Sequence, residues 1–97
     1  MNTGICKVKL YIPGNQSLKG KRQILKSLIS KLRNKYNISI AEVDDHDLWQ
    51  MATVGICCVS NNSQHVDDTI NNIVNFISQN YPEIEIVSQE VEIIHGP

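Results

Sequence analysis

Long apolar runs are absent from this chain of 97 residues, although 41% of its side chains are hydrophobic. No stretch approaches the ~18 consecutive apolar residues of a membrane-spanning helix. The opening stretch MNTGICKVKLYIPG also lacks the apolar core of a signal peptide. We therefore expect a cytoplasmic protein with no membrane partner. We also expect a single domain over residues 1–97, because the chain is too short for two cores.

Cysteine is scarce as well, with Cys6 and the adjacent pair Cys57 and Cys58. The pair lies in a predicted strand, where neighbouring side chains point to opposite faces and cannot easily share one metal ion. No CxxC motif is present. We interpret the cysteines as small apolar fillers of a half-buried sheet, and we predict no metal site, no cofactor and no catalytic residues.

Acidic residues are absent before residue 42, and basic residues are absent after residue 35. Residues 1–35 therefore carry nine positive charges and residues 36–97 carry ten negative charges, which gives the net charge of −1. Such asymmetry points to a polyanionic partner. The alternative is internal: one basic helix packs in an otherwise acidic domain, with its charges solvated or paired.

The periodicity of the apolar residues predicts six elements in the order βαββαβ. Two right-handed β-α-β crossovers around a hairpin define the ferredoxin-like sandwich, an α+β fold in which two helices cover one face of a four-stranded antiparallel sheet. The predicted strands are Ile5–Ile12, Asn37–Val43, Ala52–Ser60 and Ile84–Ile94, and the predicted helices are Ser17–Lys35 and Gln64–Asn80.

The first predicted helix carries an unusual set of charges. Its apolar side includes Leu18, Leu25, Leu28, Ile29 and Leu32, and a stripe of cations about 20 Å long follows one flank. No Asp or Glu within the helix neutralises that stripe. We predict that this helix binds nucleic acid or remains a surface helix without a ligand. The candidate residues are Lys19, Lys21, Arg22, Lys26 and Arg33.

The beginning of this helix suits a phosphate group. Ser17 is a good N-cap, and the free N–H groups and the positive end of the helix dipole favour an anion. Lys19, Lys21 and Arg22 would surround the anion, and Gly20 would let it approach the backbone. The stretch GNQSLKGKR is nevertheless not a P-loop, because its two glycines are one residue too far apart and Arg22 replaces the required hydroxyl residue.

Aromatic residues are also too few for a base-stacking RNA-recognition sheet, since the strand ATVGICCV has none. A basic helix can still recognise RNA through its phosphates and its shape.

The segment EVDDHDLWQ places four carboxylates and one imidazole within six residues. Three interpretations stay open: a metal or acid–base site, a structural loop whose Asp side chains bond to backbone turns, and a contact surface. For the contact surface, we predict that Asp47, Trp49 and Gln50 touch a partner.

The outer strands of the predicted sheet also carry charges. Because the first and last strands are neighbours in this fold, we expect Lys7 and Lys9 to face Glu90 and Glu92. Small sheets with exposed edges invite pairing, so self-association into a homodimer is the alternative to RNA binding.

Residues 12–60 resemble the YlxP-like family of small bacterial proteins, and the resemblance extends in pattern over the chain. The family pattern has a strand ending in I-P-G, then S-L-K-x-K-R-x-x-L-K-x-L, N-V-S-x-A-E-V and D-x-W-Q. The matching residues are Ser17, Leu18, Lys19, Lys21, Arg22, Lys26, Asn37, Ser39, Ala41, Glu42, Val43, Asp47, Trp49 and Gln50, whereas Gly20 stands where Glu or Lys is more usual.

The resemblance implies a ferredoxin-like fold and brings no established active site. The family's function is uncharacterised, and its genes often lie beside those for translation initiation and ribosome maturation, which implies a role near RNA or the ribosome. We therefore expect a non-enzymatic accessory protein that binds structured RNA, with ribosomal RNA as the leading candidate. The alternative is a protein–protein or homodimerisation module that binds no nucleic acid.

Overall fold

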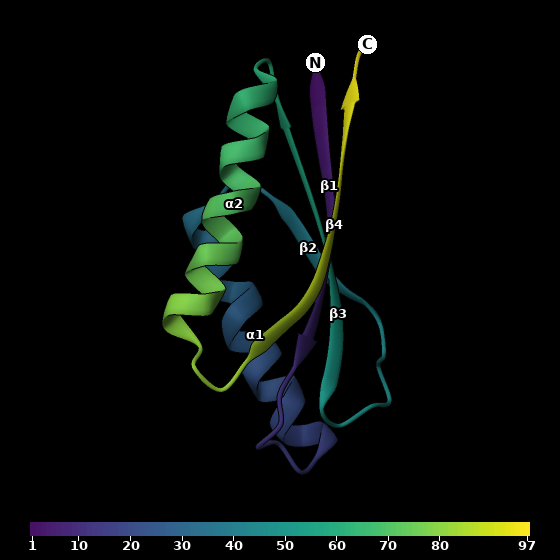
Figure 1. The fold of residues 1–97 in the computed structure, drawn as a ribbon, viewed down its shortest axis with the longest axis vertical. Coiled ribbons are helices and arrows are strands. Elements are labelled where there is room, and N and C mark those ends of the chain that lie inside the picture. Colours follow the sequence, from purple (N-terminus) through teal and green to yellow (C-terminus); the bar gives the residue numbers. More distant parts are fainter.

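Six elements follow one another in the order βαββαβ in the computed structural model, which describes residues 1–97 (Figure 1). The predicted elements are all present, and the largest difference is that the first strand begins three residues earlier. Their bounds are β1 Asn2–Tyr11, α1 Leu18–Lys35, β2 Ser39–Asp44, β3 Met51–Ser60, α2 Ser63–Asn80 and β4 Glu85–His95.

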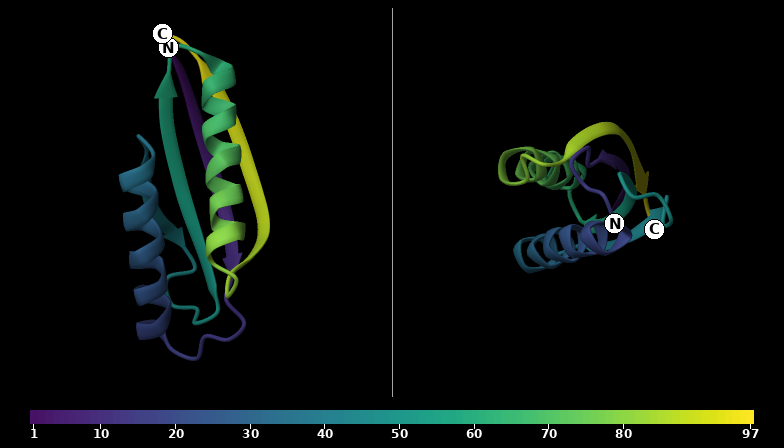
Figure 2. Two further views of the ribbon diagram at one scale, coloured as in Figure 1. Left: turned by 90° about the vertical axis from the view of Figure 1, so that its left-hand side faces the viewer. Right: turned by 90° about the horizontal axis from the view of Figure 1, so that it is seen from below.

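The strands form one antiparallel sheet in the order β2-β3-β1-β4, so β2 and β4 are its edges. Both helices lie on the same face of the sheet, and the opposite face is open (Figures 1 and 2). This arrangement confirms the predicted ferredoxin-like sandwich. Because side chains alternate along a strand, Val8 and Leu10 of β1 point into the core while Lys7 and Lys9 point to the open face.

The core is one cluster of 18 buried apolar residues between the sheet and the helices. Gly4 permits close packing in it, because a Cβ atom at this position would overlap Val66 of α2. Cys6 and Cys58 belong to the cluster, which confirms the prediction that they act as apolar fillers. Neither α1 nor α2 is long and apolar enough to cross a membrane.

The ends of the helices are set by local hydrogen bonds. Ser17 Oγ accepts a hydrogen bond from the N–H of Gly20 at 3.0 Å, and Asn62 Oδ1 accepts one from the N–H of Gln64 at 2.9 Å. Both caps satisfy N–H groups that have no partner within the helix. The N-terminal end of α1 therefore lies against the loop that follows β1, next to the turn between β2 and β3 (Figure 2).

Candidate nucleic-acid interface

The seven cations of α1 have three different surroundings. One is buried in the protein, two lie over aromatic rings, and four extend along the outer side of the helix. In this order they are Lys21; Lys31 and Lys35; and Lys19, Arg22, Lys26 and Arg33.

Lys21 is not a surface residue, and its predicted contact with nucleic acid is wrong. Its exposed fraction is 0%. The ammonium group donates hydrogen bonds to the backbone carbonyl groups of Asp45 at 2.8 Å, His46 at 3.1 Å and Met51 at 3.1 Å. It also forms an ion pair with Glu42 Oε2 at 3.1 Å. A lysine caged by acceptors of its own chain has no donor left for a phosphate.

The spacing of α1 explains why Lys21 is buried. Lys21, Leu25, Leu28 and Leu32 are separated by four, three and four residues, so they share the face of the helix that meets the sheet. This spacing is visible in the sequence, although charged residues are almost never fully buried unless they are paired. Leu18, predicted for the core face, is only half-buried because Lys21 occupies the first full turn of that face.

The three carbonyl groups use all three N–H donors of the ammonium group. Glu42 Oε2 is buried and receives no hydrogen bond, so the carboxylate is held near Lys21 by charge. Glu42 comes from β2, the carbonyl groups of Asp45 and His46 come from the turn between β2 and β3, and that of Met51 begins β3. Lys21 therefore fixes that turn against the first turn of α1.

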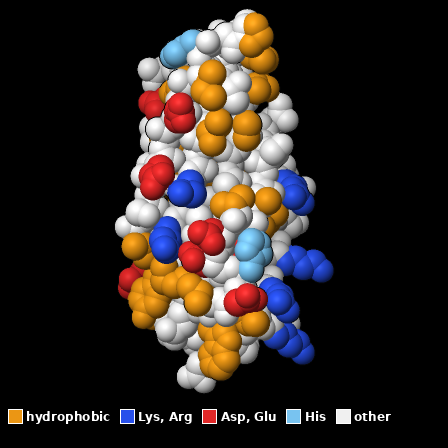
Figure 3. Space-filling model, turned by 90° about the vertical axis from the view of Figure 1, so that its right-hand side faces the viewer, with side chains coloured by type: hydrophobic (Ala, Val, Ile, Leu, Met, Phe, Trp, Pro, Cys, Tyr) orange, Lys and Arg blue, Asp and Glu red, His pale blue; other side chains and the backbone are white.

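The outer side of α1 carries a ridge of four exposed cations, Lys19, Arg22, Lys26 and Arg33, which we call the basic ridge. The protein has three ion pairs, and none of them includes a residue of the ridge. Lys and Arg side chains project together along one margin of the molecule in Figure 3. The ridge therefore carries positive charge that the protein's own carboxylates do not neutralise.

The C-terminal end of the ridge borders the edge strand β2. Arg33 Nη2 donates a hydrogen bond to the carbonyl oxygen of Ile40 at 3.1 Å. This contact orients the guanidinium group and leaves its charge in place, because a carbonyl group is neutral. A hollow of about 600 Å³ lies between the side chains of Lys26, Ile29, Ser30, Arg33 and Asn34.

Lys31 and Lys35 are on the opposite flank of the helix, toward α2. Lys31 Nζ lies 5.3 Å from the centre of the Tyr81 ring, and Lys35 Nζ lies 4.9 Å from that of Phe76. Such cation–π contacts are worth ~0.5–1 kcal/mol at exposed sites. The two flanks of α1 therefore differ in kind, since one is engaged with aromatic rings and the other is free.

The structure explains the presence of glycine at position 20 by packing within the protein, whereas the sequence predicted that Gly20 admits a phosphate. A Cβ atom here would overlap Asn15 Oδ1 and lie 3.1 Å from Ser17 Oγ. The glycine thus makes room for the capping loop, and the prediction that it admits a phosphate is not needed to explain it. Asn15 itself donates hydrogen bonds to the carbonyl oxygens of Ser17 and Trp49.

The acidic segment between β2 and β3 uses its side chains mainly within the protein. Asp44 Oδ1 accepts a hydrogen bond from the N–H of Asp45 at 2.8 Å, and Asp45 Oδ2 accepts one from Thr53 Oγ1 at 2.7 Å. No group of three His, Cys, Asp or Glu side chains is placed to hold a metal ion. Of the three interpretations, the structural loop is the one that these contacts support.

The predicted partner contacts at the end of this loop divide into two kinds. The amide of Gln50 donates hydrogen bonds to the carbonyl oxygens of Pro13 at 3.0 Å and Asn15 at 3.2 Å. Gln50 therefore joins the turn between β2 and β3 to the loop after β1, and its amide group is used within the protein. Asp47 is exposed, and the Trp49 side chain is 57% exposed beside the capping loop of α1. These two residues remain available to a partner, next to the N-terminal end of the basic ridge.

The lysines of β1 follow the predicted pairing only in part. Lys7 lies opposite Glu90, and their charged atoms are 3.7 Å apart, as expected. Lys9 lies opposite Ser88 and approaches Asp45 Oδ2 at 3.6 Å. The expected pairing of Lys9 with Glu92 is wrong, because advancing two residues along one antiparallel strand moves two residues back along its neighbour.

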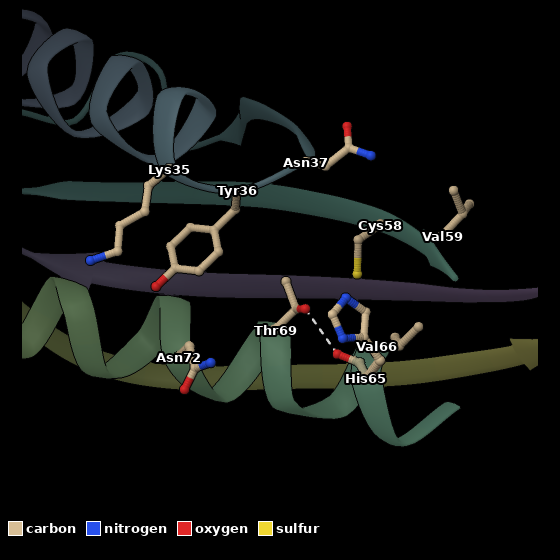
Figure 4. Close-up of a pocket in the computed structure, with 9 residues that line it drawn as sticks. All are labelled: Lys35, Tyr36, Asn37, Cys58, Val59, His65, Val66, Thr69 and Asn72. Carbon is tan, nitrogen blue, oxygen red and sulfur yellow. Dashed lines mark hydrogen bonds between the residues drawn. The ribbon is translucent and has the colours of Figure 1, made fainter. Parts of the chain in front are cut away.

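A pocket of about 300 Å³ separates the C-terminal end of α1 from the N-terminal half of α2 (Figure 4). Lys35 and Tyr36 extend into it from one side, and Asn72 and His65 line the other. Burial raises the pKa of the Cys58 thiol at its floor, and the charge of Cys57 raises it further. Cys58 therefore stays protonated at neutral pH and is a poor nucleophile.

The strand order and the two helices on one face define a ferredoxin-like α+β protein. A family model described as "Protein of unknown function (DUF503)" matches residues 3–91, and the chain belongs to this family. It is 36% identical over 80 residues to "Uncharacterized protein YlxP" of Bacillus subtilis, covering 82% of this chain and 84% of that protein. The family resemblance seen in the motifs is thereby confirmed.

Solved structures with the same fold include two designed proteins. LFR1 1 has a TM-score of 0.56 at 16% identity and covers 97% of this chain and 84% of its own. Foldit4 has a TM-score of 0.56 at 10% identity and covers both chains fully. A dimeric ferredoxin-like protein from an uncultured marine organism has a TM-score of 0.54 at 4% identity, with coverage of 100% and 99%. These likenesses concern the fold.

The acceptors that surround the Lys21 ammonium group predict that replacing Lys21 lowers the stability of the protein far more than replacing Lys19 of the same helix. Lys21→Met leaves Glu42 as a buried charge without a partner and three carbonyl groups without donors, so we expect the free energy of unfolding to fall by about 3–5 kcal/mol. Lys19→Met should change it by less than ~0.5 kcal/mol. Urea unfolding followed by circular dichroism measures both.

The double variant Lys21→Met/Glu42→Leu should be more stable than Lys21→Met alone, because it removes the unpaired charge. If Lys21→Met lowered the free energy of unfolding by less than ~1 kcal/mol, the contacts of Lys21 would not hold this part of the protein as described.

A second prediction concerns acid stability. The hydrogen bond from Thr53 lowers the pKa of Asp45, as do the charges of Lys9 and Lys21. Since this pKa is lower in the folded protein than the ~3.9 of an unfolded chain, the contribution to stability is full above that value and is lost as the pH falls through the folded-state pKa.

Asp45→Asn should therefore flatten the fall in stability at acid pH. Asn also tolerates the φ of +63° found at this position. Asp47→Asn, which removes an exposed carboxylate without an ion pair, is the control, and urea midpoints from pH 7 to about pH 3 provide the measurement. Equal acid sensitivity in wild type and Asp45→Asn would refute the assignment.

Proposed function

We propose that this protein is a non-enzymatic RNA-binding protein that holds phosphates along the basic ridge of α1. The observation that carries the proposal is the ridge itself: four exposed cations on one side of a helix, none paired with a carboxylate. Like charges three or four residues apart destabilise a helix by a few tenths of a kcal/mol per pair. A polyanion would offset that repulsion.

The length of the ridge favours a chain of phosphates over a single small anion. Lys19 and Arg33 are fourteen positions apart, which corresponds to about 21 Å along a helix. Contacts of this kind fix the position of a nucleic acid without reading its sequence. Structured RNA of a particular shape is therefore a suitable partner class.

Trp49 gives a reason to prefer RNA with unpaired bases. Its exposed ring lies beside the capping loop of α1, to which its carbonyl oxygen is bonded through Asn15. Loops and bulges of RNA present unstacked bases that pack on aromatic side chains. The gene neighbourhood implied by the family resemblance makes ribosomal RNA the leading candidate.

The proposal predicts that two pairs of charges on one helix differ in their effect. Lys19→Gln/Arg22→Gln removes half of the ridge, whereas Lys31→Gln/Lys35→Gln removes the same charge from the flank toward α2. For labelled ribosomal RNA fragments, the logarithm of the binding constant should fall linearly with log[salt]. Each phosphate contact should add ~0.7–0.9 to the steepness of that line. We expect the ridge variant to lower this slope by about 1.4–1.8 and to weaken binding.

The control variant should retain the wild-type slope, and circular dichroism would verify that both variants fold. Fluorescence polarisation over a series of salt concentrations is the measurement. Equal losses in the two variants would mean that only net charge matters, and the absence of binding by wild type at low salt would contradict the proposal itself.

A further inference from the structure

The open face of the sheet carries a group of exposed aliphatic side chains. Ile5, Val43, Val59 and Ile94 all lie on this face with exposed fractions of 42–54%. Scattered apolar residues are normal on a protein surface, but a contiguous patch on a sheet face indicates an interaction site. Figure 3 looks onto this face and shows apolar side chains in its upper half and toward its middle, with further apolar side chains at its lower end.

Strand register and one bulge bring these residues together. Val59 and Ile94 are both opposite Thr3 of β1, and Ile5 is opposite Cys57 of β3. The register of β2 shifts between Glu42 and Asp44, at Val43. The same side chain lies over Gly55 of β3, where a Cβ atom would be 2.9 Å from Val43 Cγ1. We call Ile5, Val43, Cys57, Val59 and Ile94 the aliphatic patch.

The patch contains both projections and a recess. A shallow hollow of about 270 Å³, wide open to solvent, lies over the small residues Ala41 and Gly55, with Ile5 and Cys57 at its rim. Ile5 and Val43 stand beside it as exposed side chains. A surface that carries a knob next to a hole can fit a second copy of itself across a two-fold axis, because each copy then offers a knob to the other's hole.

The charges around the patch favour the same partner. Lys7 is paired with Glu90 and Lys9 with Asp45, so the face offers no unpaired cation to a phosphate. None of the patch residues is aromatic, which leaves no platform for a nucleobase. Glu92, opposite Ile5 on the same face, has no ion pair. The face as a whole still carries charges of both signs, so it can meet itself without the repulsion that a face of a single sign would suffer.

The size of the face is sufficient for association. Strands are spaced about 4.8 Å apart and rise about 3.3 Å per residue, so four strands of which three have ten residues or more span roughly 600 Å² in projection. Standard interfaces bury about 800 Å² per partner. Side-chain relief raises the accessible area above the projected area, so the two values are comparable.

From these observations we infer that the aliphatic patch binds a second copy of this chain, sheet against sheet. Both helices lie on the far side of the sheet, so the basic ridge of each copy remains exposed in such a dimer (Figure 2). The inference stands on the open face and does not require RNA binding. If both hold, the dimer presents two ridges on opposite outer surfaces.

Sedimentation velocity over a range of protein concentrations, without RNA, tests the dimer. Wild type should dimerise, and Ile5→Glu should raise the dimer dissociation constant by about 30-fold or more, because a charge would be buried without a partner. Val91→Glu is the matched control: Val91 has the same exposed fraction of 42% but is opposite Cys6, on the helix-bearing side of the sheet. It should remain a dimer.

Cys57 supplies a readout in the unmodified protein. Cys6 and Cys58 are buried, whereas Cys57 is half-exposed within the patch. Its reaction with a maleimide should slow as the wild-type protein concentration rises, because the dimer covers it. A wild type that stays monomeric, a dimer that persists in Ile5→Glu, equal loss in both variants, or a concentration-independent reaction of Cys57 would each overturn the inference.

Discussion

The ammonium group of Lys21 joins the first turn of α1 to the segment between β2 and β3, on which the arrangement of this end of the molecule depends. The turn between β2 and β3 buries no apolar side chain of its own, since residues 44–50 are exposed or half-buried. Lys21 of α1 holds its backbone through the carbonyl groups of Asp45 and His46 and also bonds to that of Met51, where β3 begins. Asn15 and Ile12 bond to the carbonyl groups of Trp49 and Gln50 at the other end of the turn. Replacing a buried ion pair by apolar residues often leaves stability unchanged or raises it. An apolar side chain at position 21 would nevertheless make no hydrogen bonds to the carbonyl groups that Lys21 binds, so it would not fix the position of the turn against α1.

The second constraint is the division of α1 into three sides. One side packs on the sheet through Lys21 and three leucines, one meets α2 through lysines over aromatic rings, and one is free. The total charge of the chain is near zero, yet the free side keeps four cations that pair with no carboxylate. A positive charge concentrated on one side of the molecule is suited to binding phosphates. The net charge and the isoelectric point of the whole chain do not reveal it.

Local signals predicted the scaffold well. Alternation and helical spacing predicted the six elements, and the N-cap of α1 was readable as Ser17 because capping depends on neighbouring residues. The pairing of Lys7 with Glu90 followed from strands that are adjacent in the fold.

The errors arose where the outcome depends on residues distant in the chain. The burial of Lys21 requires β2 to bring Glu42 beside α1, and the role of Gly20 requires the capping loop to bring Asn15 over the helix. Lys9 lies opposite Ser88 because β4 runs antiparallel to β1, which places Glu92 opposite Ile5 instead. The recess on the open face was likewise invisible, since it combines small residues of two strands.

The most direct test of the account is to observe which side of α1 contacts RNA. Amide chemical shifts of the isotope-labelled protein, recorded by NMR during titration with ribosomal RNA fragments, resolve each residue separately. The account predicts changes at Lys19, Arg22, Lys26 and Arg33 and at Trp49, with little change at Lys31. Changes confined to the flank toward α2 or to the open sheet face, or none at all at low salt, would contradict it.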